Sequence, residues 1–356
     1  SSNDTGAIGD NLTKINTPIL TGQGEVDAKV IVTLTKGATT VALPEVTVGS
    51  DGIWTATVPS ALGDGTWAMS VRMTDVAGNS TDKTTTSFTV DTTAPANPTG
   101  GLDSSSDTGN GNAGTSSDNK TNLSRPILSG GAEKGAKVEV TVGGVTYTTT
   151  ADSSTGVWSV TVGTGGKDAN GTPTTQNLSS GSYIPSIKVT DAAGNATTQN
   201  GTAFTVDVKA PDVSTVKGAL NAVASSDSGI VGDNLTNVRL PLLKGTTDQA
   251  MDKVEITING KTYLATVNST ANSSGTYDWT VTVGAQDNAG AGLSNGYYLP
   301  AIQITDAAGN IASKTGTGFT IDLTPPNTQT ITGALSTASS NRPSAADSDP
   351  LPCHAA

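Results

Sequence analysis

The sequence is poor in the residue types that build most catalytic and redox sites. Its 356 residues include one cysteine, Cys353, and one histidine, His354, next to each other near the C-terminus. A single cysteine cannot form a disulfide within the chain, and one adjacent pair does not supply the positioned nucleophile and base of a hydrolase. Nitrogen and sulfur ligands for zinc or copper are equally scarce. We therefore predict that the chain is not an enzyme.

Basic residues, aromatic residues and long hydrophobic runs are also scarce. The chain has 19 Lys and Arg against 31 Asp and Glu, a formal net charge of −12, and only 4% aromatic residues. This negative charge should repel nucleic acid and anionic membranes and attract divalent cations. No apolar run approaches the roughly 18 residues of a membrane-spanning helix. We expect neither a nucleic acid partner nor insertion into a membrane.

What the chain does have is a set of acidic motifs that occurs three times. Each repeat has an opening motif, Asp-Thr-Gly or Asp-Ser-Gly followed by Asp-Asn, and later a loop motif, Thr-Asp-x-Ala-Gly-Asn. Each repeat closes on a strand that ends in a terminal aspartate. The acids are Asp4, Asp10, Asp75 and Asp91 in the first repeat, Asp107, Asp118, Asp191 and Asp207 in the second, and Asp227, Asp233, Asp306 and Asp322 in the third. The repeats predict three domains, 1–92, 93–208 and 209–323.

Each repeat has the alternation of β-strands. Val138, Val140 and Val142, for example, alternate with polar residues, which predicts one buried and one solvated face. One strand pattern that all three repeats share contains a tryptophan, Trp54, Trp158 or Trp279, which we interpret as a core anchor rather than a platform for sugars. No window has helical periodicity. The predicted fold is all-β, three tandem immunoglobulin-like β-sandwich domains in an elongated rod.

The two ends of the sequence lead to separate predictions. The chain begins within a repeat and has no signal peptide, so we expect an excised piece of a longer array. Residues 324–356 are expected to be a disordered or partly non-native tail. Within it, Thr-Gly-Ala-Leu at 332–335 is similar to Lys-Gly-Ala-Leu at 217–220, as though another repeat were starting.

The order of the motifs predicts where the acids meet. In such a sandwich we expect the opening motif and the loop motif of one domain to face the terminal aspartate of the domain before it. The predicted groups are Asp91 with Asp107, Asp118, Asp191 and Asn195, and Asp207 with Asp227, Asp233, Asp306 and Asn310. Asp4, Asp10 and Asp75 would form a half-site, and Asp322 would be its orphan counterpart. A further acid, Glu25, Glu133 or Asp248, is expected at the opposite, exit end of each domain, more simply as a solvated turn residue.

Crowded carboxylates need a counter-ion. Four at one joint would repel one another, and a hard cation with six to eight oxygen ligands removes the repulsion. Magnesium retains more of its waters, so Ca2+ is the predicted ion. The alternative is that each Asp and Asn only closes a tight turn. Gly109–Gly114 also fits a dinucleotide-binding fingerprint, but it follows no predicted strand and opens no helix, so we give it no weight.

Taken in order, these motifs resemble a known family. Asp-Asn-x-Thr after the opening aspartate, Val-Thr-Asp-Ala-Ala-Gly-Asn at 189–195 and Phe-Thr-Val-Asp at 204–207 are similar to the bacterial Ig-like repeats of giant type I-secreted adhesins, including biofilm-associated and non-fimbrial adhesins of Gram-negative bacteria. The resemblance covers residues 1 to about 323. It implies calcium-stiffened rods on the bacterial surface that carry an adhesive region toward a host-cell glycan or protein, or toward a biofilm surface. We expect a monomer.

Two other functions stay open at this stage. Residues 163–181 and 284–296 are insertions in the second and third repeats, and they could bind glycan or protein. The repeats could also be accessory modules of a secreted enzyme that degrades polysaccharide.

Overall fold

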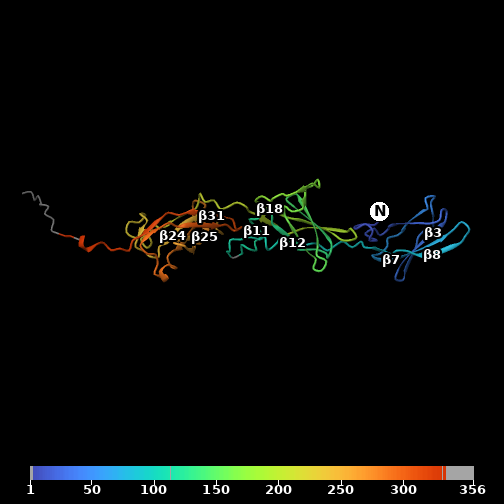
Figure 1. Ribbon diagram of the computed structural model, residues 1–356, viewed down its shortest axis with the longest axis horizontal. Helices are drawn as coiled ribbons and strands as arrows, with labels where there is room; N and C mark the ends of the chain where they lie inside the picture. Colours follow the sequence, from blue (N-terminus) through green and yellow to red (C-terminus); the bar gives the residue numbers. More distant parts are fainter. Residues whose placement is uncertain (1–2, 113, 331, 334–356) are drawn as a thin grey trace, which may run out of the picture.

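Three β-modules lie one after another along the length of the molecule (Figure 1). The structure, a computed structural model, describes residues 3–112, 114–330 and 332–333. Each module has its own hydrophobic core, and the three clusters share no residue. The predictions for Cys353, His354 and most of the tail lie outside the described residues.

The strands of module 1 form one large sheet and one two-stranded sheet. The large sheet has the order β1-β9-β7-β3-β4, with β5 and β8 beside it, and the small sheet is β2-β6. The strands are β1 (Leu12–Thr13), β2 (Ile19–Gln23), β3 (Lys29–Lys36), β4 (Thr39–Ala42), β5 (Val46–Thr47), β6 (Ile53–Thr57), β7 (Gly65–Thr74), β8 (Ser80–Thr84) and β9 (Phe88–Val90).

Module 2 forms three sheets, β10-β12-β15, β11-β21-β18 and β17-β16-β14-β13-β19-β20. Its strands are β10 (Gly101–Leu102), β11 (Lys120–Thr121), β12 (Ile127–Gly131), β13 (Lys137–Val142), β14 (Val145–Thr150), β15 (Val157–Thr161), β16 (Gly166–Lys167), β17 (Pro173–Thr174), β18 (Gly181–Tyr183), β19 (Ser186–Thr190), β20 (Ala196–Asn200) and β21 (Phe204–Val206).

Module 3 has a similar pattern, β22-β24-β28-β27, β23-β32-β29 and β26-β25-β30-β31. Its strands are β22 (Lys217–Leu220), β23 (Leu235–Thr236), β24 (Leu242–Thr247), β25 (Lys253–Ile258), β26 (Lys261–Leu264), β27 (Thr266–Ala271), β28 (Tyr277–Thr282), β29 (Gly296–Tyr298), β30 (Ala301–Thr305), β31 (Ile311–Thr315) and β32 (Phe319–Ile321). Two single 3₁₀ turns, η1 (Asn288–Gly290) and η2 (Thr328–Thr330), complete the described elements.

The cores follow the predicted alternation. In module 2, Val138 and Val140 of β13 are fully buried and pack in one cluster with Trp158 of β15, so two sheets face each other across the core. Trp54, Trp158 and Trp279 are at most 4% exposed. The prediction of an all-β sandwich fold is confirmed, and the tryptophans lie inside the modules rather than on a binding surface.

Proline explains where one strand changes sheets. In module 1, β7 is continuous and pairs with both β9 and β3. In module 2 the chain stops at Tyr183 of β18, passes Pro185 and resumes as β19 in the other sheet. Pro185 lacks the N–H that a continuous strand would use. Pro300 lies between β29 and β30 in the same way.

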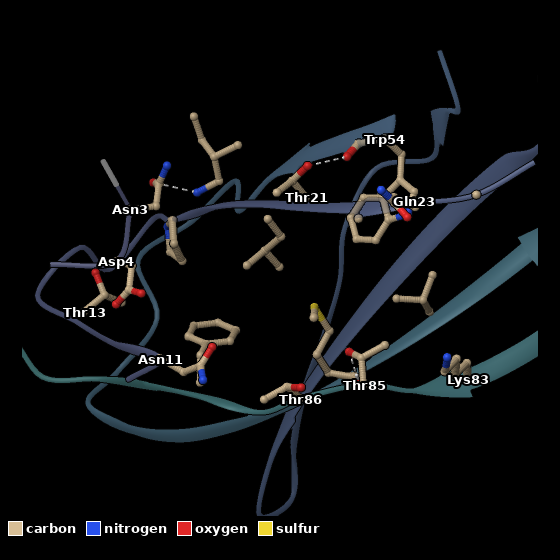
Figure 2. Close-up of a pocket in the computed structure, with 18 of the residues that line it drawn as sticks. Asn3, Asp4, Asn11, Thr13, Thr21, Gln23, Trp54, Lys83, Thr85 and Thr86 are labelled. Atoms are coloured by element: carbon tan, nitrogen blue, oxygen red, sulfur yellow. Dashed lines mark hydrogen bonds between the residues drawn. The ribbon is translucent and has the colours of Figure 1, made fainter. Parts of the chain in front are cut away.

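Module 1 differs from the other two in its smallest sheet. β10 pairs with β12 in module 2 and β22 pairs with β24 in module 3, but β2 pairs with β6 alone among the described residues. A groove of about 760 Å³ runs along the uncovered edge of β2, between Gln23 and Trp54 on one side and Thr85 and Thr86 on the other (Figure 2).

Candidate cation-binding joints

Each opening motif lies at the far end of its own module, beside that module's terminal aspartate. β1, β11 and β23 follow the opening motifs and pair in parallel with the last strands β9, β21 and β32. The Asp91 N–H accordingly donates to the Thr13 carbonyl at 2.9 Å, and the Asp207 N–H donates to the Thr121 carbonyl at 2.8 Å. The N-terminus therefore lies on the side of module 1 that faces module 2 (Figure 1).

From this position the opening motif contacts the loop motif of the next module. The Thr5 hydroxyl donates to the Ala193 carbonyl, and the Thr108 hydroxyl donates to the Ala308 carbonyl, the same contact one repeat later. Gly6 fits so closely that a Cβ there would stand 1.9 Å from the Ala192 oxygen. The Thr-Gly of the opening motif is thus an interdomain contact, with glycine required by the close approach of two backbones.

These contacts correct the predicted grouping by one module. From the order of the motifs, Asp107 and Asp118 are predicted at the joint between modules 1 and 2, and Asp227 and Asp233 at the next one. The structure places Asp107 and Asp118 at the joint between modules 2 and 3, and Asp227 and Asp233 beside Asp322 at the downstream end of module 3. The reason is that β10 and β22 precede the opening motifs, so the chain has already crossed the module.

Two joints result, each formed by acids of both neighbours. Asp4 and Asp10 are not part of an isolated half-site, and Glu133 lies at the upstream end of its module rather than at the exit end. Asp248 likewise lies at the upstream end of module 3, where it accepts the Asp212 N–H, and Glu25, the equivalent of Glu133, lies with Asp75 at the upstream end of module 1. The predicted position of Glu25 and Asp248 at the exit end is therefore wrong. Joint 1 gathers Asp4, Asp10 and Asp91 with Glu133, Asp191 and Asn195, and joint 2 gathers Asp107, Asp118 and Asp207 with Asp248, Asp306 and Asn310.

The terminal aspartate and the next loop motif meet as the sequence predicted. The Asn195 Nδ2 donates both to the Asp91 carbonyl oxygen and to Asp191 Oδ2, each at 2.9 Å. The Asn310 Nδ2 repeats this with the Asp207 carbonyl at 2.8 Å and Asp306 Oδ2 at 2.9 Å. The asparagine thus ties the backbone of one module to the carboxylate of the next.

Most of the acids close turns as well. In each opening motif the second aspartate accepts from the N–H two residues on, as Asp118 Oδ1 does from Lys120 at 3.0 Å. The asparagine that follows this aspartate has a left-handed backbone conformation, with φ near 60° at Asn11, Asn119 and Asn234. Asparagine tolerates this conformation better than most residues, which explains the repeated Asp-Asn pair. The alternative role as turn formers is therefore real. In the loop motifs both carboxylate oxygens of Asp75, Asp191 and Asp306 accept hydrogen bonds.

The first aspartate of each opening motif leaves its other oxygen without a partner. Asp4 Oδ2 accepts from the Gly9 N–H at 2.6 Å, and Asp107 Oδ2 accepts from the Asn119 N–H at 3.0 Å. The Oδ1 atoms of Asp4, Asp107 and Asp227 are buried with no hydrogen-bond partner. A buried, unpaired carboxylate oxygen is unfavourable, and it is also the kind of oxygen that Ca2+ binds.

Acids crowd the downstream side of both joints. The pKa of Glu133 is raised, mainly by burial and to a smaller extent by the charges of Asp191 and Asp91. At joint 2, burial raises the pKa of Asp252 to about 7 against the hydrogen bond from Thr247, and the charge of Asp248 adds to the rise. Asp248 and Asp252 each have a buried Oδ1 without a partner. At each joint the charge of one acid therefore raises the pKa of another.

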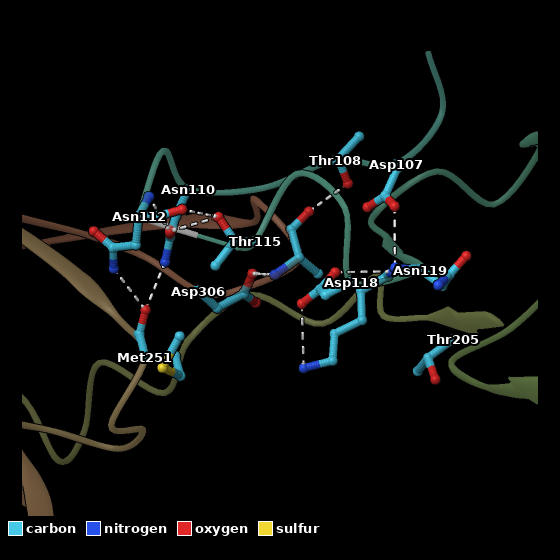
Figure 3. Close-up of polar contacts among 12 residues, drawn as sticks. Asp107, Thr108, Asn110, Asn112, Thr115, Asp118, Asn119, Thr205, Met251 and Asp306 are labelled. Atoms are coloured by element: carbon cyan, nitrogen blue, oxygen red, sulfur yellow. Dashed lines mark hydrogen bonds and ion pairs between the residues drawn. The ribbon is translucent and has the colours of Figure 1, made fainter. Parts of the chain in front are cut away.

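Asp252 and the loop at Asn110 were not predicted from the sequence as parts of a joint. Asp252 stands where the other repeats have the buried alanines Ala28 and Ala136, and an acid at an alanine position was the available signal. The Asn110 Nδ2 donates to the Met251 carbonyl at 2.6 Å across joint 2 (Figure 3). The glycine-rich run that matched a dinucleotide fingerprint is therefore a contact between modules.

In the part of the chain that the structure describes, no three Asp, Glu, His or Cys side chains stand close enough together to hold a metal ion. The side-chain atoms that could coordinate a cation at each joint are nonetheless all oxygens, which a hard cation prefers as ligands. The chemistry of the donors fits Ca2+, and the joint geometry does not yet form a closed shell.

The bridging asparagine can be tested against a matched control. In Asn310→Ala the tie to Asp207 is lost, so we expect the angle between modules 2 and 3 to vary more and joint 2 to weaken by about 1 kcal/mol. Asn79→Ala removes the same residue from the loop motif of module 1, where Asn79 bonds only within its own loop to Asp75. Interdomain residual dipolar couplings should change for Asn310→Ala and not for Asn79→Ala. Equal changes in both would contradict a bridging role.

The chain belongs to the bacterial Ig-like domain family, which it matches three times, over residues 1–92, 94–208 and 214–323. None of the helical segments among the described residues is long and apolar enough to cross a membrane. A comparison with curated proteins found no match.

Several solved structures are similar to this chain. A Ca2+-stabilized adhesin with which an Antarctic bacterium binds ice is 26% identical, over 86% of this chain and 68% of that one, with a TM-score of 0.36. A structure from a 1.5-MDa bacterial ice-binding adhesin is 26% identical over 87% and 92%, with a TM-score of 0.34. A tetra-tandem repeat from the extending region of a large adhesion protein is 21% identical over 89% and 74%, with a TM-score of 0.26.

Proposed function

We propose that the chain is part of a bacterial surface adhesin, in which Ig-like modules act as a spacer held straight by Ca2+ at the joints. Its units are residues 1–92, 93–208 and 209–323. The spacer works outside the cell and carries the adhesive part of the parent protein toward a host-cell glycan or protein, or toward a biofilm surface. Its role is mechanical rather than catalytic. Membership in the bacterial Ig-like family and the resemblance of the motifs to adhesin repeats support this proposal.

One observation carries the calcium part of the proposal. Asp4 and Asp107 occupy equivalent positions at the two joints, and each has a buried Oδ1 without a partner. The residues that follow them, Thr5 and Thr108, contact the loop motifs that contain Asp191 and Asp306. A bound Ca2+ would neutralise these acids and link the two modules. The carboxylate oxygens already fixed by turn hydrogen bonds keep the loops in place while the second oxygens bind. Calcium binding at extracellular modules is typically weak, about 10⁻⁴–10⁻³ M, which suits an ion-rich exterior.

Scattering from the chain in solution tests the spacer function. With Ca2+ at several millimolar we expect the maximum dimension of an extended row of three modules, and with chelator a shorter and broader distribution of dimensions. Small-angle X-ray scattering of the intact chain in both conditions makes the measurement, with Mg2+ at equal ionic strength as the control for general screening. Identical distance distributions with Ca2+ and with chelator would rule out calcium-straightened joints.

A further inference from the structure

The two joints differ in the length of the opening motif that reaches the next module. The two aspartates of the motif are six residues apart at 4–10 and at 227–233, and eleven residues apart at 107–118. The longer motif belongs to module 2 and lies at joint 2, where the Thr108 hydroxyl contacts the Ala308 carbonyl. An insertion of five residues is therefore present at joint 2 and absent from joint 1.

This insertion carries two asparagines whose side chains cross joint 2 (Figure 3). The Asn110 Nδ2 donates to the Met251 carbonyl at 2.6 Å and to the Thr305 carbonyl at 3.2 Å. The Asn112 Nδ2 donates to the same Met251 carbonyl at 3.0 Å. We call these three hydrogen bonds the clasp. They connect module 2 both to the turn before β25 and to the end of β30.

Hydrogen bonds within module 2 hold the clasp in shape. Asn110 Oδ1 accepts from the Asn112 N–H at 2.9 Å and from the Thr115 hydroxyl at 3.2 Å. Asn110 is 4% exposed, and Thr115 is fully buried. Because the amide oxygen of Asn110 is fixed inside its own loop, the amide nitrogen is directed at module 3. A donor positioned in this way loses little side-chain entropy when the joint closes.

Module 3 has a longer turn on its side of the clasp. The turn that contains Met251 runs over 248–252, one residue more than the equivalent turn of module 2 at 133–136. The backbone carbonyl that both asparagines contact belongs to this longer turn. The insertions of modules 2 and 3 therefore meet each other, which indicates a contact built for this one pair of modules.

Joint 1 has weaker contacts from its shorter motif. The Thr5 hydroxyl contacts the Ala193 carbonyl, and Lys14 Nζ donates to the Gly194 carbonyl at 2.7 Å. Lys14 is exposed, and a long lysine side chain loses much rotamer freedom when it is held in one place. Residues 6–10 are exposed. Among the described residues, no hydrogen bond joins the motif at 3–10 to the turn at 133–136, so joint 1 lacks a clasp.

The repulsion between acids also differs at the two joints. The pKa of Glu133 is raised mainly by burial, then by the charge of Asp191 in its own module and by that of Asp91 in module 1. Part of this repulsion therefore crosses joint 1. At joint 2 the charge that acts on Asp252 is that of Asp248, which belongs to the same module. Repulsion within module 3 does not push module 3 away from module 2.

We propose that the clasp keeps joint 2 closed without Ca2+, and that the chain bends at joint 1 when Ca2+ is removed. The statement about joint 2 is independent of the proposed calcium function, and the statement about joint 1 rests on it. Without the ion, like charges repel at joint 1, and no clasp opposes them among the described residues. Modules 2 and 3 then move as one rigid body, and the rod has one calcium-dependent hinge rather than two.

Distances between spin labels across each joint test the proposal. Asp82, Thr198 and Ser313 are exposed and occupy equivalent positions on β8, β20 and β31. With Cys353→Ser removing the only native cysteine, Asp82→Cys with Thr198→Cys reports on joint 1, and Thr198→Cys with Ser313→Cys reports on joint 2. Electron–electron double resonance in chelator should give a broad distance distribution at joint 1 and a narrow one at joint 2. With Ca2+ both should be narrow.

Asn110→Asp removes the clasp and preserves its loop. The new side chain keeps the oxygen that the loop uses, but it places a second oxygen against the Met251 and Thr305 carbonyls in place of the donor. In chelator the open population of joint 2 should rise about tenfold or more, and its distance distribution should become as broad as that of joint 1. Asn170→Ala is the control, since Asn170 is an exposed residue between β16 and β17 of the same module. It should change neither joint.

The outcomes separate the clasp from the calcium function. A broad distribution at joint 2 of the wild-type chain in chelator would overturn the clasp. So would a distribution at joint 2 that stays narrow with Asn110→Asp. A distribution at joint 1 that is equally narrow with Ca2+ and with chelator would instead contradict the calcium function and the hinge, while broadening at joint 2 by Asn110→Asp would still support the clasp.

Discussion

Removal of Ca2+ is expected to lower the melting temperature of this chain by about 10–20 °C. An ion that binds only the assembled joint, at a free concentration about a hundredfold above its Kd, stabilises it by about 2.7 kcal/mol, and each kcal/mol shifts the melting of a module of this size by about 4–8 °C. The physical reason is that the ion neutralises acids that the joints hold together, among them Glu133, whose pKa is raised by burial and by Asp191 and Asp91. Differential scanning calorimetry with Ca2+ and with chelator measures the effect.

Two equivalent aspartates separate a joint effect from a local one. Asp306 and Asp75 both accept the N–H of the asparagine four residues on, at 2.9 and 2.8 Å, but only Asp306 faces an upstream module. Asp306→Asn should remove the calcium-dependent part of the stability of joint 2, and Asp75→Asn should leave the calcium response of both joints intact. If the two variants gain equally on adding Ca2+, the ions are not at the joints.

The second large effect concerns the core of module 2. Trp158→Ala should destabilise this module by about 3–5 kcal/mol, because Trp158 is 1% exposed and belongs to the core cluster of module 2. The three cores share no residue, so modules 1 and 3 should keep their own unfolding transitions. Hydrogen exchange should show loss of protection confined to residues of module 2.

The control for this substitution lies on the same strand. Val157 precedes Trp158 in β15 and is 56% exposed, so Val157→Ala should change stability by less than about 0.5 kcal/mol. Loss of protection in all three modules after Trp158→Ala would mean that the rod unfolds as one unit.

The sequence was sufficient for the fold because its signals are local. Alternation such as Val138, Val140 and Val142 depends only on the two-residue period of a strand, and the tryptophans stand inside such patterns. The sequence also brought Asn195 to Asp91 and Asn310 to Asp207, which follows from the direction of the last strands. These inferences needed no knowledge of how the modules begin.

The placement of the opening motifs failed for a physical reason. The strand before the motif has only two paired residues in module 2, Gly101 and Leu102, and glycine is a poor strand former. If that strand is overlooked, the opening motif is placed where the chain enters its module. Its two aspartates are then assigned to the joint before the correct one. Asp252 was missed because it belongs to no repeated motif, and its effect depends on burial that only the fold creates.

The contacts at the joints also set an order of folding. Thr5 meets Ala193 and Thr108 meets Ala308, pairs separated by 188 and 200 residues along the chain. In a chain that emerges from its N-terminus, each module can complete its own core long before the loop that docks on it has been made. Contacts so distant in sequence form slowly. The modules should therefore fold first and stay loosely linked. Each joint should become rigid only after the module that follows it has been synthesised.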